Sequence, residues 1–306
     1  MSNRIHLCYG ADQNMLEPLC VSAHSAAASV QGRDLSIWVF HPDLTPGAIE
    51  QLRRVLAPFP GTALQVQAVD LEVFADLKGL HGAVMPFVKL LLPRRMQRQA
   101  ARIVVLDADT VVVGGLEALY DHDLSGRALG AVSYGPLKNT LEAEFFAAQG
   151  LDLQAASFNS GVMLVDVNRW NENRTTERLI ETITAVDPQT VESDQPFLNL
   201  AFYDNFEPLR IRYNKRAGPD THIPPADAAD GVLHFVGLPK PWDLGGRLFN
   251  VNYRVYEAYR RRAGVPHTPA LGLVPDERWE RAAKGLWAGL RTALPLPASM
   301  ASCMLP

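Results

Sequence analysis

Two aspartates two residues apart follow a short apolar run in the middle of the chain. Residues 103–106 read IVVL, which is typical of a strand buried on both faces of a parallel sheet, and Asp107 and Asp109 follow. In open α/β sheets ligands bind where the strands end, and two carboxylates at this spacing can share one divalent cation. In the alternative interpretation Asp107 caps the next turn and Asp109 is merely solvated.

The order of elements along the chain predicts which loops meet these acids. Strands are expected over residues 5–9, 35–40, 64–68, 103–106, 128–133, 158–167 and 232–236. Helices are expected to follow the first two strands and to cover residues 86–96, so the fold class is α/β with a doubly wound, mostly parallel, Rossmann-like sheet. The loops expected to converge on one edge of this one sheet are residues 10–14, 107–110, 159–161 and 234–242.

At that edge His234 would add a nitrogen to the oxygens of Asp107 and Asp109. This set is too small for a closed cage and too hard for a structural zinc, so it predicts Mn²⁺ or Mg²⁺ completed by substrate oxygens. A diphosphate would supply those oxygens, and Lys240 with Lys89 would neutralise its charge. Among the 8 histidines His234 is singled out because a glycine and Lys240 follow it at a spacing that curls a loop around a phosphate.

Composition limits the class of protein and its location. The 306 residues, 47% hydrophobic, can bury a large core, and a net charge of −4 argues against nucleic-acid binding. The 3 cysteines have neither disulfide nor zinc spacing. The chain shows no signal peptide and no apolar run long enough to span a membrane, which predicts a cytoplasmic protein.

The last forty residues differ from the rest. We expect one domain over residues 1–264 and a helical extension over residues 265–306. Residues 276–291 place Trp279 and Trp287 on one helical face and basic residues on the opposite arc, which is the pattern of an interfacial helix. This predicts peripheral contact with the inner face of the cytoplasmic membrane, and docking of the same face on the protein's own core is the alternative.

Four motifs, in order, resemble glycosyltransferase family 8 between residues 5 and 242. They read DAD at 107–109, FNSGVMLVDVNRW at 158–170, SDQPFLN at 193–199 and HFVGLPKPW at 234–242. The resemblance implies a GT-A fold and a retaining hexosyltransferase that uses Mn²⁺ and a UDP-sugar. The donor would be UDP-galactose or UDP-glucose, and the acceptor a glycan, such as lipopolysaccharide or another cell-surface saccharide.

The resemblance also implies roles for individual residues. The metal ligands would be Asp107, Asp109 and His234. Asp12 and Asn14 would contact uracil and ribose, Asp107 would lie near the ribose, and Lys89, Gly237 and Lys240 would contact the diphosphate. Asn159, Asp194 and Gln195 would surround the donor sugar, and Ala108 would also belong to the donor site. The catalytic residues would be Gln195 and Asp194. Lys89 stands where the family usually has arginine, and Met15 stands where an aromatic side chain commonly stacks on uracil.

Two mechanisms of sugar transfer, and three other classes of protein, fit parts of this sequence. A carbonyl oxygen such as that of Gln195 could stabilise positive charge on the anomeric carbon during front-face attack, whereas a two-step route needs a nucleophile, for which Asp194 is the candidate. The run IVVLDADTV also fits haloacid-dehalogenase phosphatases, but the second acidic pair they require is missing. A nucleotidyltransferase would share the sheet and the paired acids, and a binder of sugar nucleotides without enzymatic activity would keep the same loops.

Overall fold

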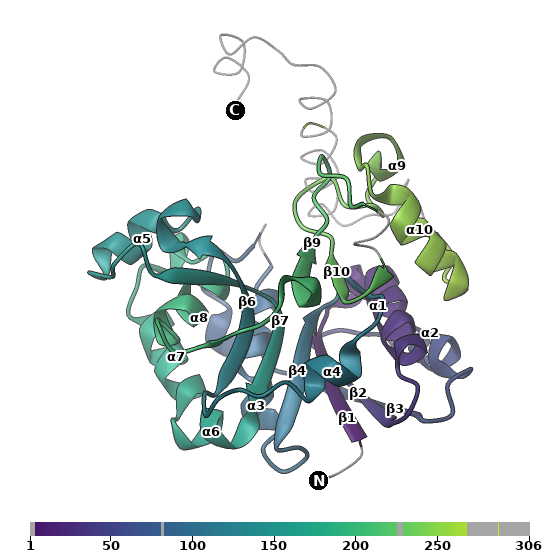
Figure 1. The fold of residues 1–306 in the computed structure, drawn as a ribbon, viewed down its shortest axis with the longest axis horizontal. Helices are drawn as coiled ribbons and strands as arrows, with labels where there is room; N and C mark the ends of the chain where they lie inside the picture. Colours follow the sequence, from purple (N-terminus) through teal and green to yellow (C-terminus); the bar gives the residue numbers. More distant parts are fainter. Residues whose placement is uncertain (1–3, 81–82, 225–228, 268–286, 288–306) are drawn as a thin grey trace.

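The centre of the protein is a seven-stranded sheet in the order β3-β2-β1-β4-β7-β6-β8 (Figure 1). The computed structural model describes residues 4–80, 83–224, 229–267 and 287. The strands of this sheet are β1 (Arg4–Gly10), β2 (Asp34–His41), β3 (Thr62–Ala68), β4 (Arg102–Asp107), β6 (Leu129–Pro136), β7 (Ala156–Asp166) and β8 (Glu207–Pro208). The strand order reverses between β1 and β4, and such a switch point is where open α/β sheets bind their ligands.

One strand runs against all the others. The strands β1, β2, β3 and β4 pair in parallel, and β8 pairs in parallel with β6. β7 is antiparallel to both of its neighbours, β4 and β6. The predicted doubly wound, mostly parallel sheet is confirmed. Because β7 is reversed, its first residues, which include Asn159, lie at the edge where β4 ends.

A second, smaller sheet lies above this edge. Its order is β5 (Thr110–Val112), β10 (Val232–His234) and β9 (Lys215–Arg216), with β10 antiparallel to β5 and parallel to β9. The prediction that the strand around residues 232–236 belongs to the main sheet is wrong. The chain turns after Asp107, so β5 leaves the main sheet and offers a new edge with which β10 pairs.

Helices cover both faces of the main sheet. They are α1 (Leu16–Ser29), α2 (Pro46–Leu56), α3 (Leu92–Arg95), α4 (Leu116–Tyr120), α5 (Ala143–Ala148), α6 (Val167–Glu172), α7 (Thr175–Thr184), α8 (Gln195–Ala201), α9 (Gly246–Phe249) and α10 (Tyr253–Arg262). In Figure 1 α1, α2 and α10 lie to the right and α5, α6, α7 and α8 to the left. Short 3₁₀ segments are η1 (Gln13–Met15), η2 (Glu72–Phe74), η3 (Met85–Leu90), η4 (Leu137–Asn139), η5 (Pro188–Thr190) and η6 (Ile211–Asn214).

Two apolar clusters, one on each face of the sheet, form the core. In β4 the residues alternate between them: Val104 and Leu106 pack with α1, α2 and the small sheet, whereas Ile103 and Val105 pack with η3 and α6. All four side chains are fully buried. A run without polar residues is what a strand covered on both faces requires, so the sequence around the two acids folds as predicted.

Residues 86–96 do not form the single helix that the sequence predicts. The segment is η3 followed by the four-residue α3, with Pro93 in the first turn of the second piece. Proline has no N–H to donate, and inside a continuous helix its ring would clash with the carbonyl four residues earlier. The break leaves Lys89 at the end of a short segment that packs against β1 and points toward the edge of the sheet.

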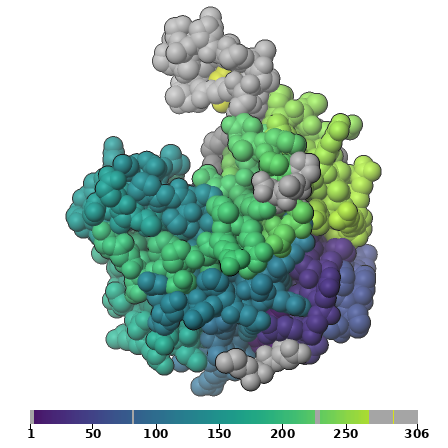
Figure 2. Space-filling model, viewed as in Figure 1, coloured from purple at the N-terminus to yellow at the C-terminus, as the bar shows by residue number. Residues whose placement is uncertain are grey.

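Segments after residue 200 cover the middle of the molecule. Figure 2 shows the segment that carries β9 and β10 in green, between the teal segment around α5 and the yellow-green α9 and α10. Within the described ranges every helix is too short or too polar to cross a lipid bilayer. The interfacial helix predicted over residues 276–291 falls almost entirely outside those ranges, and the division of the chain at residue 264 stays a prediction.

Candidate active site

A tight turn between β4 and β5 carries the two acids. β4 ends at Asp107 and β5 begins at Thr110, so Asp109 lies in the turn. The Thr110 hydroxyl donates to the backbone oxygen of Asp107 (2.8 Å) and shares a hydrogen bond with the Ser22 hydroxyl of α1 (2.9 Å). The first contact links the two ends of the turn, and the second, which is buried, fixes the turn on the helix behind it.

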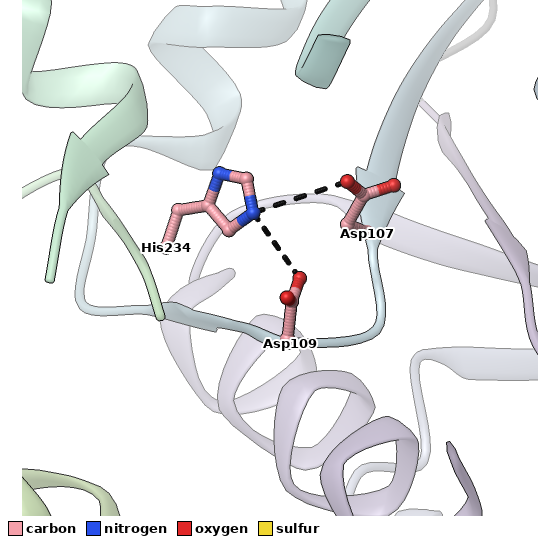
Figure 3. A group of neighbouring side chains, drawn as sticks. All are labelled: Asp107, Asp109 and His234. Carbon is pink, nitrogen blue, oxygen red and sulfur yellow. Dashed lines mark ion pairs between the residues drawn. The ribbon is translucent and has the colours of Figure 1, made fainter. Parts of the chain in front are cut away.

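His234 reaches the acids through strand pairing. The residue lies opposite Thr110 in the antiparallel β5–β10 pair, and the backbone N–H of Phe235 donates to the backbone oxygen of Asp109 (2.9 Å). Its Nε2 atom lies 3.2 Å from Asp109 Oδ1 and 3.9 Å from Asp107 Oδ2 (Figure 3). The three side chains predicted as metal ligands are thus brought together, and one potential ligand atom from each lies within 4.8 Å of the other two.

Two lysines orient the carboxylates. Lys89 Nζ lies 3.0 Å from Asp107 Oδ1, and Lys240 Nζ lies 2.7 Å from Asp109 Oδ2. Each lysine therefore contacts the oxygen that faces away from His234 and leaves the other oxygen directed at the imidazole. Asp109 Oδ1 is buried and accepts no hydrogen bond. Two carboxylate oxygens and one imidazole nitrogen converge here, and this set of ligand atoms fits a divalent cation such as Mn²⁺.

The buried charges shift the pKa values of the acids in opposite directions. Burial raises the pKa of Asp109, but Lys240 and His234 outweigh it and hold the pKa well below its usual range. Burial raises the pKa of Asp194, against the lowering effect of Lys89. Burial lowers the pKa of Lys89, but Asp107 and Asp194 together raise it well above its usual range. Asp109 and Lys89 are thus charged at neutral pH.

Lys89 also links the acids of the proposed metal site to Asp194, a predicted catalytic residue. Its ammonium lies 3.1 Å from Asp194 Oδ2 and donates to the Ser160 hydroxyl (3.1 Å), in addition to its contact with Asp107. Asp194 is 2% exposed and immediately precedes α8. All three N–H donors of Lys89 have partners in the chain, so the predicted direct contact of Lys89 with a diphosphate stays a prediction.

The side chains of Gln195 and Asn159 contact one another at the start of α8. Asn159 Nδ2 donates to Gln195 Oε1 (2.9 Å), and the backbone N–H of Ser160 donates to the same oxygen (3.4 Å). Below them, buried Asn199 bonds both the N–H and the oxygen of Phe158 (2.8 and 2.9 Å) and so fixes α8 to β7. The amide oxygen of Gln195 is therefore held by two donors.

Gly161 provides space for the imidazole. The sequence suggests that this glycine allows the backbone to approach a ligand; in the structure the close neighbour is His234. A Cβ atom at Gly161 would lie 2.1 Å from His234 Cε1 and 2.5 Å from its Nδ1. No real Cβ contact is that short, so His234 can occupy its position only because residue 161 has no side chain.

We expect Gly161→Ala to displace His234. Residues that orient a metal ligand typically contribute about 10-fold to 100-fold to metal affinity. We therefore expect Mn²⁺ affinity to fall by at least about tenfold. Isothermal titration with Mn²⁺ in the presence of UDP measures the change. Gly32→Ala is the matched control because its Cβ would meet nothing within 4 Å. Equal Mn²⁺ affinity in both variants would contradict the assignment.

The other residues predicted for the donor lie in the loops that follow β1 and β10 and in the turn that carries the two acids. Asp12 and Asn14 follow β1, where Asp12 caps η1 by accepting from the Met15 N–H (3.0 Å). Gly237 has a left-handed backbone (φ +73°) in the loop that leads from β10 to Lys240. Ala108 is buried in the turn between the acids. Their roles at the donor stay predictions.

One buried residue at the site was not identified from the sequence. Asn214, at the end of η6, accepts from or donates to His234 Nδ1 (3.0 Å) and donates to Asn159 Oδ1 (2.9 Å). In the sequence it is a single asparagine in the polar stretch RIRYNKR, with no spacing that links it to the other motifs. Only the pairing of β9 with β10 brings it beside His234.

The fold is of the GT-A type, and Asp107, Asp109 and His234 could hold a metal ion at its edge. A structure of galactosyltransferase LgtC in complex with donor and acceptor sugar analogues superposes with a TM-score of 0.70 over 90% of this chain and 100% of that chain, at 22% identity. The family profile "Glycosyl transferase family 8" matches residues 6–244, and the chain belongs to this family. This membership argues against the phosphatase and the nucleotidyltransferase, which are other families.

Two curated relatives show how far the similarity extends. Glycosyltransferase GlyF of Streptococcus pneumoniae serotype 4 is 27% identical over 78% of this chain and 58% of its own length. Lipopolysaccharide 1,3-galactosyltransferase of Salmonella typhimurium is 24% identical over 80% of this chain and 75% of its own length. The chain thus spans a little more than half the length of GlyF.

Proposed function

We propose that this protein is a retaining, Mn²⁺-dependent transferase that moves galactose or glucose from a UDP-sugar to a glycan acceptor. The observation that carries the proposal is the convergence of Asp107 Oδ2, Asp109 Oδ1 and His234 Nε2 at one edge of the sheet. The lipopolysaccharide 1,3-galactosyltransferase relative supports a cell-surface saccharide such as lipopolysaccharide as the acceptor. Mg²⁺ is the alternative metal.

Departure of UDP requires that negative charge on its diphosphate be stabilised. A divalent cation bound to the acids and His234 would act as a Lewis acid on the diphosphate oxygens. Lys240 Nζ contacts Asp109 Oδ2 and the backbone oxygen of Phe235, and an ammonium has three donors. Its third N–H is therefore available for a phosphate oxygen, and a fixed positive charge at this position would lower the barrier.

Opening of the glycosidic bond leaves positive charge on the anomeric carbon of the sugar. The Gln195 amide oxygen, held by Asn159 and the backbone of Ser160, would present the negative end of its dipole to that carbon. A carbonyl held in advance needs no reorganisation during the reaction. The acceptor hydroxyl would attack from the side of the leaving group and give its proton to the departing phosphate, which retains the anomeric configuration.

A covalent route through Asp194 is less well supported. That carboxylate is 2% exposed and its Oδ2 faces Lys89 at 3.1 Å, so its negative charge is already paired. The amide of Gln195 is a poor nucleophile. We therefore propose front-face attack, and a sugar covalently attached to Asp194 or Gln195 during turnover, detected by mass spectrometry of the intact protein, would contradict it.

Donor hydrolysis tests the proposed function without knowledge of the acceptor. Incubation with a panel of UDP-sugars and Mn²⁺ should release UDP slowly from UDP-galactose or UDP-glucose, because water can replace the acceptor hydroxyl. EDTA should abolish the release. A panel in which no UDP-hexose is cleaved, or in which EDTA has no effect, would contradict the donor class or the metal dependence respectively.

A further inference from the structure

We propose that Asn214 is a positioning residue that fixes two groups at once: the tautomer of His234 and the direction of the Gln195 amide. The inference rests on the proposed function for the roles of these two side chains. Its basis is a continuous chain of hydrogen bonds, here called the amide chain, that runs from His234 through Asn214 and Asn159 to Gln195.

Asn214 lies between the two halves of the site and is fully buried. It ends η6 and directly precedes β9, whose residue Arg216 lies opposite His234 in the small sheet. Its side-chain amide lies 3.0 Å from His234 Nδ1 and 2.9 Å from Asn159 Oδ1, and its exposed fraction is 0%. A buried amide without partners is costly, so both contacts are held strongly.

A backbone N–H sets the direction of every bond in the amide chain. Gly161 N donates to Asn159 Oδ1 (3.0 Å), and a backbone N–H can only donate. The atom of Asn159 that faces Gly161 is therefore its oxygen, and Asn214 must present its NH₂ group to that same oxygen. The oxygen of Asn214 then faces His234.

The consequence for His234 is a single neutral tautomer. Because Asn214 offers an oxygen, His234 Nδ1 must carry the proton and donate it. The lone pair of the neutral ring is then on Nε2, the atom that faces Asp109 at 3.2 Å and Asp107 at 3.9 Å. Metal-binding histidines generally have their other ring nitrogen held in this way, which fixes the orientation of the ring and its basicity.

At the other end the amide chain orients Gln195. With its oxygen turned to Gly161 and Asn214, Asn159 must present its NH₂ group to Gln195, and it donates to Oε1 at 2.9 Å. The backbone N–H of Ser160 faces the same oxygen. The Gly161 N–H fixes which way the Asn159 amide faces, and the Asn214 NH₂ group is the second donor to the same oxygen. Asn214 therefore supports the position of the Gln195 carbonyl as well as the tautomer of His234, although the two groups have separate roles.

We expect Asn214→Ala to disturb both ends. At a pH at which the His234 ring is neutral, the metal-free protein labelled with ¹⁵N-histidine should show a mixture of His234 tautomers in the variant, which lacks the acceptor, whereas the wild type should show only the form with Nδ1–H. Mn²⁺ affinity and kcat should each fall by about tenfold or more. The signal of His234 is assigned by its loss in a His234→Gln protein.

Asn214→Asp should change the Gln195 end of the amide chain without changing the His234 end. A carboxylate at residue 214 can still accept the hydrogen bond from His234 Nδ1. Its second oxygen, however, would face Asn159 Oδ1, and two acceptors repel. The Asn159 amide would then turn away, and its hydrogen bond to Gln195 Oε1 would be lost. At a pH at which the His234 ring is neutral, the tautomer and the Mn²⁺ affinity should therefore stay close to those of the wild type, whereas kcat for donor hydrolysis should fall by about tenfold or more. A purely structural role would lower both quantities together.

Asn252→Asp is the matched control. Asn252 is equally buried (0% exposed) and donates to Gly218 and Thr221 oxygens (2.8 and 2.9 Å), without contact with the amide chain. It should alter thermal stability without altering the tautomer of His234. A wild-type His234 with its proton on Nε2 overturns the inference even if UDP-sugars are cleaved. The Nδ1–H form in a protein that cleaves no UDP-sugar would instead count against the proposed function alone.

Discussion

Asp109→Asn should abolish the Mn²⁺-dependent binding of UDP while the protein stays folded. The substitution keeps the shape of the side chain but removes the charge that Lys240 contacts at 2.7 Å and turns an amide toward His234 Nε2. A neutral amide is a much weaker ligand for a hard cation than a carboxylate. We expect Mn²⁺ affinity to fall by at least about 100-fold. Substitution of residues that only hydrogen-bond to a metal ligand typically costs about 10-fold to 100-fold, and loss of a ligand itself should cost at least as much.

Isothermal titration with UDP, with and without Mn²⁺, measures this loss, and circular dichroism checks the fold. Asp34→Asn is the matched control, because Asp34 forms an exposed ion pair with Arg4 (2.9 Å) at the opposite end of the sheet. The control should bind UDP as the wild type does. Mn²⁺-dependent UDP binding that survives in Asp109→Asn would show that the metal, if any, binds elsewhere.

Lys89→Met should destabilise the whole domain. The substitution leaves the carboxylates of Asp107 and Asp194 without their common counter-charge, and Asp194 is almost fully buried. Removal of one partner from a buried ion pair costs about 3–5 kcal/mol. Urea unfolding should therefore show a large loss of free energy, whereas Lys78→Met, which breaks an exposed pair with Glu192, should cost no more than about 1 kcal/mol.

The loss in Lys89→Met should depend on pH in a defined direction. Burial already raises the pKa of Asp194, and without Lys89 this pKa should rise further. An acid whose pKa is higher in the folded than in the unfolded protein costs stability above that pKa, and the cost fades as the pH falls. The difference in unfolding free energy between wild type and variant should shrink between neutral and acidic pH. A constant difference would mean that Asp194 is not the unpaired charge.

The central strand and its acids could be predicted because local sequence determines them. Four apolar residues followed abruptly by Asp107 and Asp109 indicate a strand covered on both faces that ends at a polar edge. The strand and helix order up to residue 68 also has a clear periodicity. Both features act over a few residues, and the packing of the rest of the chain does not alter them.

Features that depend on pairing between distant strands could not be predicted. The convergence of residues 159–161 on this edge was predicted, but its cause was not. A strand's sequence does not reveal its direction, and the antiparallel pairing of β7 is what brings its first residues to the edge where β4 ends. The separation of β5 and β10 into a second sheet follows from the turn after Asp107, which the periodicity does not encode. His234 was identified from its neighbours in sequence, although the sheet to which it was assigned is wrong.

The contacts of single polar residues were also beyond the sequence. The role of Lys89 at a diphosphate stays a prediction, but its ion pairs with Asp107 and Asp194 and its hydrogen bond to Ser160 had no signal in the sequence. Asn214 gave no signal, because an isolated asparagine before a short strand is ordinary in a loop. Both residues act through hydrogen bonds between segments far apart in the chain, and only the folded structure shows which groups those segments bring together.

Anomalous diffraction from crystals soaked with Mn²⁺ and UDP tests the central claim most directly. We expect a single strong manganese peak at the edge of β4, about 2.2 Å from Asp107 Oδ2, Asp109 Oδ1 and His234 Nε2, with diphosphate oxygens completing the coordination. A peak that lacks His234 as a ligand, or ordered UDP at this edge with no manganese beside it, would contradict the account.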